Sequence, residues 1–256
     1  MSFLQSIILG IIEGVTEFLP ISSTGHLVLA SDLMKISQTE FVKSFEISIQ
    51  LGAILSVVVL YFKSFVSDFE ALKRIIVAFL PTAVLGVILY KIVKTFLLGN
   101  DKIIVYSLLV GGLILVLFEY FYKEKEEGAS KISEITLKQS FTIGIFQSLA
   151  MIPGVSRSAA TIVGGLILGI KRKTIVEFSF LLAVPTMLAA TALDLLKSYK
   201  NFSSNDFGIL SVGFLVSFFV AILSIKFLLS FIKKHTFLPF GVYRIILAII
   251  FLFWIM

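Results

Sequence analysis

The stretch EGVTEFLPISSTGH, residues 13–26, places polar side chains inside an otherwise apolar part of the chain. It is preceded by FLQSIILGII at 3–12 and followed by LVLA at 27–30. Pro20 disfavours helical backbone at Leu19, because the proline ring collides with the residue before it. The segment 3–30 has roughly ten apolar residues on either side of this break, about half of the roughly 20 that cross a bilayer. We therefore expect a helix–loop–helix hairpin that enters a membrane and returns to the same face.

The composition of the whole chain also indicates a membrane protein. Of its 256 residues, 58% are hydrophobic and 15% are charged, and the mean hydropathy is +1.04. Soluble domains have about 45–50% apolar and about 25% charged residues. We predict an all-α polytopic membrane protein with six transmembrane helices, at 44–62, 75–93, 103–122, 178–196, 207–229 and 240–256.

A second apolar segment, residues 140–170, is broken in the same way by PGVSRS at 153–158. The two breaks align at an offset of 134 residues, which places Glu13 opposite Gln147 and ISST at 21–24 opposite VSRS in the second break. We therefore expect two re-entrant hairpins and an internal duplication of the chain.

The duplication predicts one integral membrane domain, 1–256, with repeat one at about 1–122 and repeat two at about 140–256. Three spans follow each hairpin, and this odd number inverts the second repeat relative to the first, as in many transporters. Lys and Arg number 12 in the loops on the face of the linker 123–139, against 7 on the other face. The positive-inside rule makes the linker face cytoplasmic. The first hairpin then enters from outside and the second from the cytoplasm, so their tips meet near the midplane.

Several function classes are excluded by what the sequence lacks. It contains no cysteine, which excludes disulfides, thiolate metal sites and cysteine nucleophiles. No basic patch is interleaved with aromatic residues, so we expect no nucleic-acid partner. A Walker loop, an HExxH motif and a Rossmann glycine pattern are also absent. We expect no cleavable signal peptide at 1–12, and the sequence assigns no oligomeric state.

Two carboxylates open the polar stretch. Glu13 and Glu17 are four residues apart and share one face of a helix. A charged side chain in mid-membrane costs about 2.5–3.5 kcal/mol on insertion scales. The pair therefore needs a divalent cation, a basic partner or a wet cavity, and we take both residues as candidate catalytic and metal-binding groups. The alternative is a pair that only fixes helix packing.

Hydroxyl groups follow the proline. Ser22, Ser23 and Thr24 would begin the second arm, where free backbone N–H groups and the helix dipole favour a phosphate. The alternative is helix capping by one of the three hydroxyls. His26 lies three residues after Ser23, within helical reach of its hydroxyl, and we expect it to act in catalysis or to contact phosphate. A packed, hydrogen-bonded histidine is the alternative.

The second break supplies the opposite charge. The planar guanidinium of Arg157 suits bidentate contact with a phosphate, although an ion pair with Glu13 or Glu17 is the alternative. Ser156 and Ser158 either contact phosphate or cap the next helix. Together the two breaks suit an anionic phosphate whose charge grows during transfer. In a protein with so little soluble mass, we expect that phosphate to be carried by a lipid.

The two breaks, EGVTEFLPISSTGH and PGVSRSAAT, closely resemble the signature motifs of the undecaprenyl-pyrophosphate phosphatases, the bacitracin-resistance family. FEISIQLGAILSV at 45–57 and EFSFLLAVPTM at 177–187 are also similar to that family. The resemblance implies removal of the terminal phosphate from the C55 isoprenyl pyrophosphate carrier of peptidoglycan synthesis, and with it bacitracin resistance. It also implies a multi-pass protein of the bacterial plasma (inner) membrane, with the active site open to the outer face.

The resemblance assigns roles to individual residues. It implies Ser23 as nucleophile, His26 as its base or as the nucleophile itself, and Thr24, Ser156 and Arg157 as phosphate ligands. It implies dependence on a divalent cation, Mg²⁺ or Ca²⁺, at the carboxylate pair. On the residues alone, Glu17 is an alternative base for Ser23, and direct attack by water is a further alternative.

Two other functions compete with the phosphatase. The inverted repeat by itself favours a membrane transporter or flippase of a polyprenyl phosphate lipid, which would release no phosphate. A scaffold, in which polar residues only fix helix packing, predicts that Ser23→Ala costs stability rather than activity.

Overall fold

The computed structural model describes the chain apart from residues 38, 98–99, 125–126, 199–206 and 256. The regular secondary structure of the described residues is helical, with no β-strand among them. Short π or 3₁₀ turns occur at Val93–Leu97, Ile132–Glu134 and Leu149–Met151. In chain order the α-helices are α1 (Phe3–Thr16), α2 (Ser23–Leu33), α3 (Glu40–Leu60), α4 (Phe62–Ser67), α5 (Phe69–Ile92), α6 (Asp101–Phe121), α7 (Leu137–Ser148), α8 (Arg157–Ile167), α9 (Arg172–Ser198), α10 (Phe207–Phe231) and α11 (Leu238–Ile255).

Five helices are long and apolar enough to cross a membrane: Phe41–Leu60, Phe69–Ile92, Asp101–Phe121, Arg172–Ala192 and Phe207–Phe231. They coincide with five of the six predicted spans, and the polytopic membrane class is confirmed. The sixth predicted span, 240–256, corresponds to α11, whose apolar part Leu238–Phe253 is shorter, and residue 256 lies outside the described part.

Two helices begin earlier than the hydropathy of the sequence predicts. α5 begins at Phe69 and α9 at Arg172, ahead of the predicted spans 75–93 and 178–196. The side chain of Asp68 caps α5, accepting a hydrogen bond from the backbone N–H of its first turn. Charged residues in these first turns lower the local hydropathy without breaking the helix, so a composition window begins too late.

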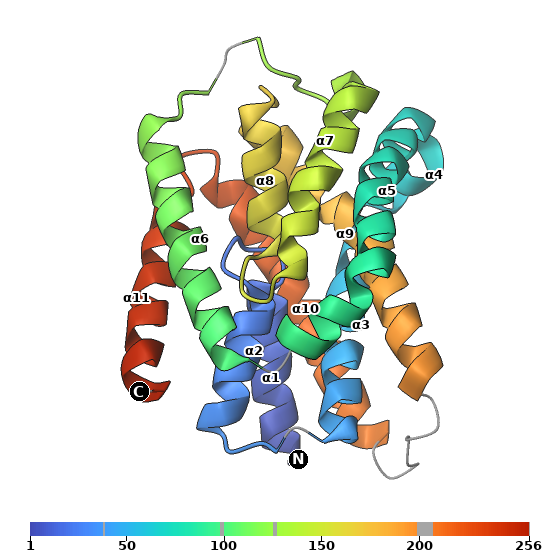
Figure 1. Cartoon of the computed structure of the whole chain (residues 1–256). Coiled ribbons are helices and arrows are strands. Elements are labelled where there is room, and N and C mark those ends of the chain that lie inside the picture. The colour runs from blue at the N-terminus through green and yellow to red at the C-terminus, as the bar shows by residue number, and fades with distance from the viewer. Residues whose placement is uncertain (38, 98–99, 125–126, 199–206, 256) are drawn as a thin grey trace.

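Two hairpins of short helices lie between the long ones. α1 and α2 have 14 and 11 residues, and α7 and α8 have 12 and 11. At 1.5 Å per residue none of them matches a bilayer core of about 30 Å. Figure 1 shows α1 and α2 in the lower half of the molecule and α7 and α8 in the upper half, with the two turns near mid-height.

Small residues bring the outer arm of each hairpin close to a long helix. α1 packs on α10, where a Cβ added at Gly10 would lie 2.8 Å from the carbonyl oxygen of Gly213. α7 packs on α5, where a Cβ at Gly144 would collide with the carbonyl oxygen of Ala78. Close backbone approach at small residues is typical of helix packing in membranes. These two contacts fix the height at which each turn sits.

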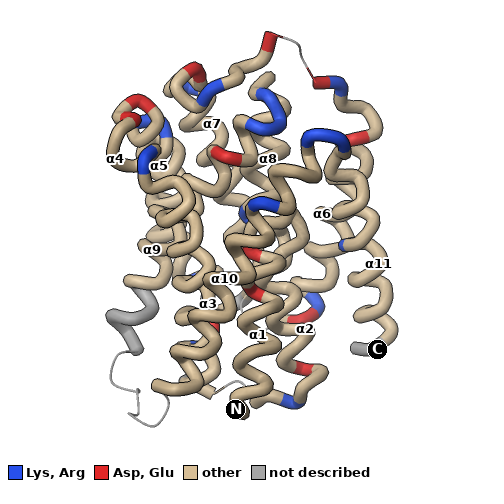
Figure 2. Tube along the Cα trace, turned by 180° about the vertical axis from the view of Figure 1, so that it is seen from behind, with Lys and Arg blue, Asp and Glu red and all other residues tan. Residues whose placement is uncertain are grey.

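Charged residues lie mainly at the two ends of the molecule (Figure 2). At the end that carries the interhelical linker, buried Arg172 pairs with Glu119. The backbone N–H of Phe237 donates to the same carboxylate at 3.0 Å. This cluster joins α6, α9 and the start of α11 away from the hairpin turns.

Candidate active site

The turns of the two hairpins are in direct contact. The hydroxyl of Ser158, in the first turn of α8, donates to the carbonyl oxygen of Phe18 at 2.9 Å. One position earlier, Nη2 of Arg157 lies 3.2 Å from Oε1 of Glu17. Residues 140 positions apart in sequence are therefore joined by two polar contacts.

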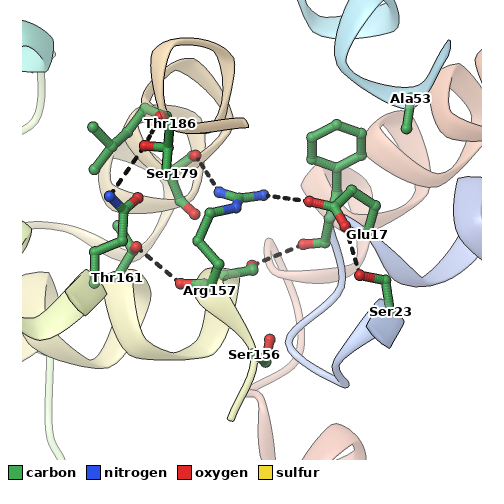
Figure 3. Close-up of polar contacts among 12 residues, drawn as sticks. Glu17, Ser23, Ala53, Ser156, Arg157, Thr161, Ser179 and Thr186 are labelled. Carbon is green, nitrogen blue, oxygen red and sulfur yellow. Dashed lines mark hydrogen bonds and ion pairs between the residues drawn. The ribbon is translucent and has the colours of Figure 1, made fainter. Parts of the chain in front are cut away.

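Glu17 lies at the centre of this junction (Figure 3). Its Oε2 accepts a hydrogen bond of 2.6 Å from the hydroxyl of Ser23, while its Oε1 faces Arg157. Nη1 of Arg157 donates to the carbonyl oxygen of Ser179 on α9 at 2.8 Å, which orients the guanidinium. The arrangement is a serine hydroxyl, a carboxylate and a guanidinium in one hydrogen-bonded row.

Glu13 lies beside this row, one helical turn before Glu17, and is completely buried. Neither of its carboxylate oxygens has a hydrogen-bond partner among the described residues. A buried carboxylate without hydrogen bonds is costly unless a proton or a cation compensates it. The carboxylate pair therefore has unused capacity for a cation.

The residue just before the helix that follows each turn is a serine with positive φ. Ser22 precedes α2 with φ of 72°, and Ser156 precedes α8 with φ of 76°. Each hydroxyl caps its helix, accepting from the backbone N–H of Gly25 at 3.4 Å and of Ala159 at 3.2 Å. Both serines therefore act as helix caps, which is the alternative that their sequence positions allowed. Because both helices start at the junction, their positive dipole ends point toward the same place.

His26 is directed away from Ser23. Its Nδ1 lies 2.7 Å from the carbonyl oxygen of Ser22, and its Nε2 lies 2.7 Å from the hydroxyl of Tyr243, on whose ring it stacks. The expected contact between the imidazole and the hydroxyl of Ser23 is not among these bonds, and Glu17 occupies that position instead. Thr24, another predicted phosphate ligand, is exposed.

Comparison with known proteins identifies the family. The model of the family described as bacitracin resistance protein BacA matches residues 6–250 of the chain. The chain belongs to the BacA family. This confirms the resemblance seen in the two motifs, and every candidate site residue lies within the matched range.

Curated relatives of this BacA-family chain carry the name undecaprenyl-diphosphatase. One, from Sulfurihydrogenibium sp. (strain YO3AOP1), is 56% identical over 99% of this chain and 100% of its own length. A second, from Aquifex aeolicus (strain VF5), is 52% identical over 96% of both chains. A third, from Methanococcus aeolicus, is 46% identical over 98% of both.

One residue at the junction was missed by sequence reasoning. Arg244 of α11 is completely buried and donates to the carbonyl oxygens of Pro20, at 3.4 Å, and Gly154, at 3.0 Å, one in each turn. A third bond, of 3.1 Å, goes to the carbonyl of Ser107. A Cβ at Gly111 would collide with this guanidinium. A lone arginine in the last apolar segment was the only available signal, and nothing near it in the sequence marked its partners.

The metal ligands that this site of the BacA-family chain offers are the two carboxylates of Glu13 and Glu17. Within the described part of the chain, no group of three or more His, Cys, Asp or Glu side chains is arranged to hold a metal ion. Two carboxylates alone suit Mg²⁺, which keeps several waters and is usually bound by one or two carboxylates together with substrate phosphates.

Proposed function

We propose that this protein is an undecaprenyl-diphosphatase, which hydrolyses undecaprenyl pyrophosphate to undecaprenyl phosphate and phosphate. The observation that carries the proposal is the row Ser23–Glu17–Arg157, which joins a nucleophile, a proton acceptor and a phosphate-binding group across two hairpins. The curated relatives with 46–56% identity over nearly the whole chain support the same activity. The product would recycle the lipid carrier of peptidoglycan synthesis, which accounts for bacitracin resistance in the family's name.

Arg157 and the starts of α2 and α8 would hold the terminal phosphate. Nε of Arg157 is buried and has no partner among the described residues, so the guanidinium retains donor capacity. When the pyrophosphate binds, the guanidinium exchanges its contact with Glu17 for phosphate oxygens. Ser22, Thr24, Ser156 and Ser158 lie at the two helix starts around this position, where their backbone N–H groups favour an anion.

The reaction that we propose has two steps. Oγ of Ser23 attacks the terminal phosphorus, and Oε2 of Glu17, already in contact with that hydroxyl, takes its proton. The bond from phosphorus to the bridging oxygen breaks, and the lipid monophosphate leaves. Glu17 then passes this proton to the departing lipid monophosphate. Water attacks the phosphoserine and gives a proton to Glu17, the bond from phosphorus to Oγ of Ser23 breaks, and Oγ takes that proton from Glu17 as inorganic phosphate leaves. His26 acts as a positioning residue for the turn through Ser22 in this scheme, rather than as the base.

Glu13 and Glu17 are the residues that would hold a divalent cation, Mg²⁺ or Ca²⁺, with oxygens of the pyrophosphate. The support is the burial of Glu13 without hydrogen-bond partners among the described residues. A bound cation neutralises phosphate charge and stabilises the leaving oxygen. Glu13 would serve chiefly this purpose, because Glu17 is already engaged with Ser23 and Arg157.

The membrane arrangement that we propose has six crossings and two re-entrant hairpins. It rests on the five long apolar helices, with α11 as the sixth crossing, and on hairpins too short to cross. The division into repeats, about 1–122 and 140–256, is supported by α2 and α8, whose first residues Ser23 and Arg157 are 134 positions apart. The hairpins approach from opposite ends (Figure 1), as an inverted repeat requires.

The orientation that we propose places the linker 123–139 in the cytoplasm and opens the site to the outer face of a bacterial plasma membrane. The support is the excess of Lys and Arg in loops on the linker side, 12 against 7. The first hairpin, which supplies Ser23 and both carboxylates, then reaches the midplane from the outer side.

The decisive experiment measures phosphate release from long-chain isoprenyl pyrophosphate by the purified protein in detergent. We expect release with Mg²⁺ that a chelator abolishes, and none from folded Ser23→Ala or Arg157→Ala. Release that survives Ser23→Ala would transfer the role of nucleophile to water or His26. If the native protein releases phosphate from no isoprenyl pyrophosphate, the hydrolase proposal is wrong and lipid transport becomes the better explanation.

A further inference from the structure

Gln147 on α7 occupies the position of the second hairpin that is equivalent to Glu13 of the first. The residue is buried, and a buried amide needs partners within the protein. Nε2 of Gln147 donates to the hydroxyl of Thr82 on α5 at 2.9 Å and to that of Thr186 on α9 at 3.1 Å. Both amide hydrogens are therefore used, and one side chain joins α7 to two long helices.

Arg157, on the other arm of the hairpin, is bonded to the same helix α9. Its Nη1 donates to the carbonyl oxygen of Ser179 at 2.8 Å. Ser179 and Thr186 are seven residues apart, about two helical turns, so they share one face of α9. Figure 3 shows both on the side of the guanidinium that is away from Glu17. One face of α9 therefore carries the anchors of both α7 and α8.

The other nitrogens of this guanidinium are the ones available to a phosphate. Nη2 lies 3.2 Å from Oε1 of Glu17, and Nε is buried without a partner among the described residues. The direction in which Arg157 presents these two nitrogens depends on where α9 holds the carbonyl oxygen of Ser179. A misplacement of about 1 Å in a group that orients a reacting phosphate can lower the rate by about 10²-fold. The position of α9 relative to the second hairpin therefore matters for the reaction.

We propose that Gln147 is a positioning residue for Arg157, whose two amide bonds fix α9 against α5 and α7 so that Ser179 holds the guanidinium in the direction of the phosphate. The inference rests on the proposed function, in which Arg157 binds the terminal phosphate, and adds to it a residue that acts through α9. An amide suits this task because it donates to two hydroxyls at once, whereas an ionised carboxylate only accepts. The two hairpins thus use one equivalent position differently, Glu13 for a cation and Gln147 for alignment.

The test is a double-mutant cycle. Gln147→Leu removes both amide donors at similar volume, and Arg157→Lys keeps a positive charge but has no planar fork to be aligned. For the native protein, the two single variants and the double variant, kcat and KM are measured for phosphate release from one long-chain isoprenyl pyrophosphate. Gln139→Leu is the matched control, because this glutamine lies at the other end of α7 and its Nε2 donates to the carbonyl oxygen of Leu168 at 3.0 Å.

We expect Gln147→Leu to lower kcat/KM by about tenfold when residue 157 is arginine and by less than about twofold when it is lysine, because the fork that Gln147 aligns is then already lost. Gln139→Leu should keep the native value. If Gln147→Leu lowers kcat/KM by the same factor in both backgrounds, the glutamine supports the fold as a whole and the proposal is wrong. Should Gln147→Leu fail to fold, Thr186→Val removes only the bond to α9, and the same cycle is measured with it.

Binding of inorganic pyrophosphate, followed by calorimetry with Mg²⁺, separates this inference from the proposed function. The expected pattern is the same, a dissociation constant raised about tenfold by Gln147→Leu with arginine at position 157 and less than about twofold with lysine. If the native protein releases no phosphate from any isoprenyl pyrophosphate but shows this pattern, the hydrolase proposal fails and the positioning role is supported. Equal weakening in both backgrounds refutes the positioning role and leaves the hydrolase proposal intact. A native protein that neither binds pyrophosphate nor releases phosphate refutes both.

Discussion

The hairpins α1–α2 and α7–α8 share one backbone arrangement, but the first carries the acidic residues Glu13 and Glu17 and the second carries Arg157. Ser22 and Ser156 share left-handed backbone and cap helices of equal length, 11 residues each. A non-glycine residue in this conformation costs roughly 1–2 kcal/mol, and such strain is typically found at functional sites. The strained turn occurs in both hairpins, so it belongs to the scaffold and not to the catalytic group of either one.

The difference between the hairpins lies in the side chains that precede the turn. Glu13 of α1 is buried without hydrogen-bond partners among the described residues, whereas Gln147, 134 positions later on α7, donates to Thr82 at 2.9 Å and to Thr186 at 3.1 Å. In the second hairpin, the amide N–H groups of Gln147 thus have hydrogen-bond partners within the protein. In the first hairpin, the charge of Glu13 is left to be compensated by another group. The two hairpins share the same turn, and only the first holds the acidic groups.

We expect the largest effect at Ser23, whose equivalent position in the second hairpin is occupied by Arg157. Ser23→Ala removes the proposed nucleophile, and we expect loss of at least about 10³-fold in kcat, as for other covalent catalysts. Ser31→Ala, at a buried position on the same helix, is the matched control and should retain activity. Phosphate release from isoprenyl pyrophosphate measures both. Comparable activity in the two variants would place the chemistry elsewhere.

The second hairpin contributes the positively charged side chain of Arg157. Arg157→Lys keeps the charge but loses the fork that spans Glu17 and Ser179, and we expect a loss of about 10²-fold in kcat/KM. Arg74→Lys, near the linker end of the molecule, serves as the control for loss of a guanidinium. Equal activity in the two variants would reduce Arg157 to a simple positive charge.

Arg244 joins the two hairpins, and its removal should separate them. Arg244→Met keeps much of the side-chain volume but leaves the buried carbonyl oxygens of Pro20 and Gly154 without their donor. We expect a loss of about 2 kcal/mol in unfolding free energy, since each lost donor to a buried carbonyl costs about 1–3 kcal/mol and the turns can partly relax. Unfolding in detergent, followed by circular dichroism, would measure it. An unchanged stability would mean that other contacts hold the turns together.

Exchanging Glu13 and Gln147 tests the central difference directly. Glu13→Gln gives the first hairpin the residue of the second, and we expect the Mg²⁺ concentration for half-maximal activity to rise about tenfold or more. Gln147→Glu should lower stability by about 1–3 kcal/mol, because the amide donors to Thr82 and Thr186 are lost. A Glu13→Gln variant with native Mg²⁺ dependence would exclude Glu13 from the cation site.

The smallest effect concerns the shared turn. Ser156→Gly relieves the left-handed backbone at φ of 76° but also removes the cap, so the two changes should nearly cancel, within a few tenths of a kcal/mol. Ser156→Ala keeps the strain and loses the cap, and should cost about 1 kcal/mol. Thermal unfolding of both variants separates strain from capping. A glycine variant less stable than the alanine variant would show that the backbone at this position is not strained.

Much of the fold follows from local sequence. Pro20 and PGVSRS predict the two breaks, and the predicted offset of 134 residues is the separation of the first residues of α2 and α8, Ser23 and Arg157. The ends of the long helices were predicted less well. Asp68 begins α5 ahead of its apolar part, and hydropathy does not register a cap.

The sequence by itself determined the membrane class, the two hairpins and the set of groups available for chemistry, since periodicity, helix breakers and residue types are properties of short segments. Only the tertiary structure decided which groups meet. Helical spacing allows His26 to reach Ser23, but the imidazole contacts Tyr243, 217 positions away, and Glu17 contacts Ser23 instead. The partners of Arg244 likewise lie in segments distant in sequence. Such contacts are fixed by how whole helices pack, which no local pattern encodes.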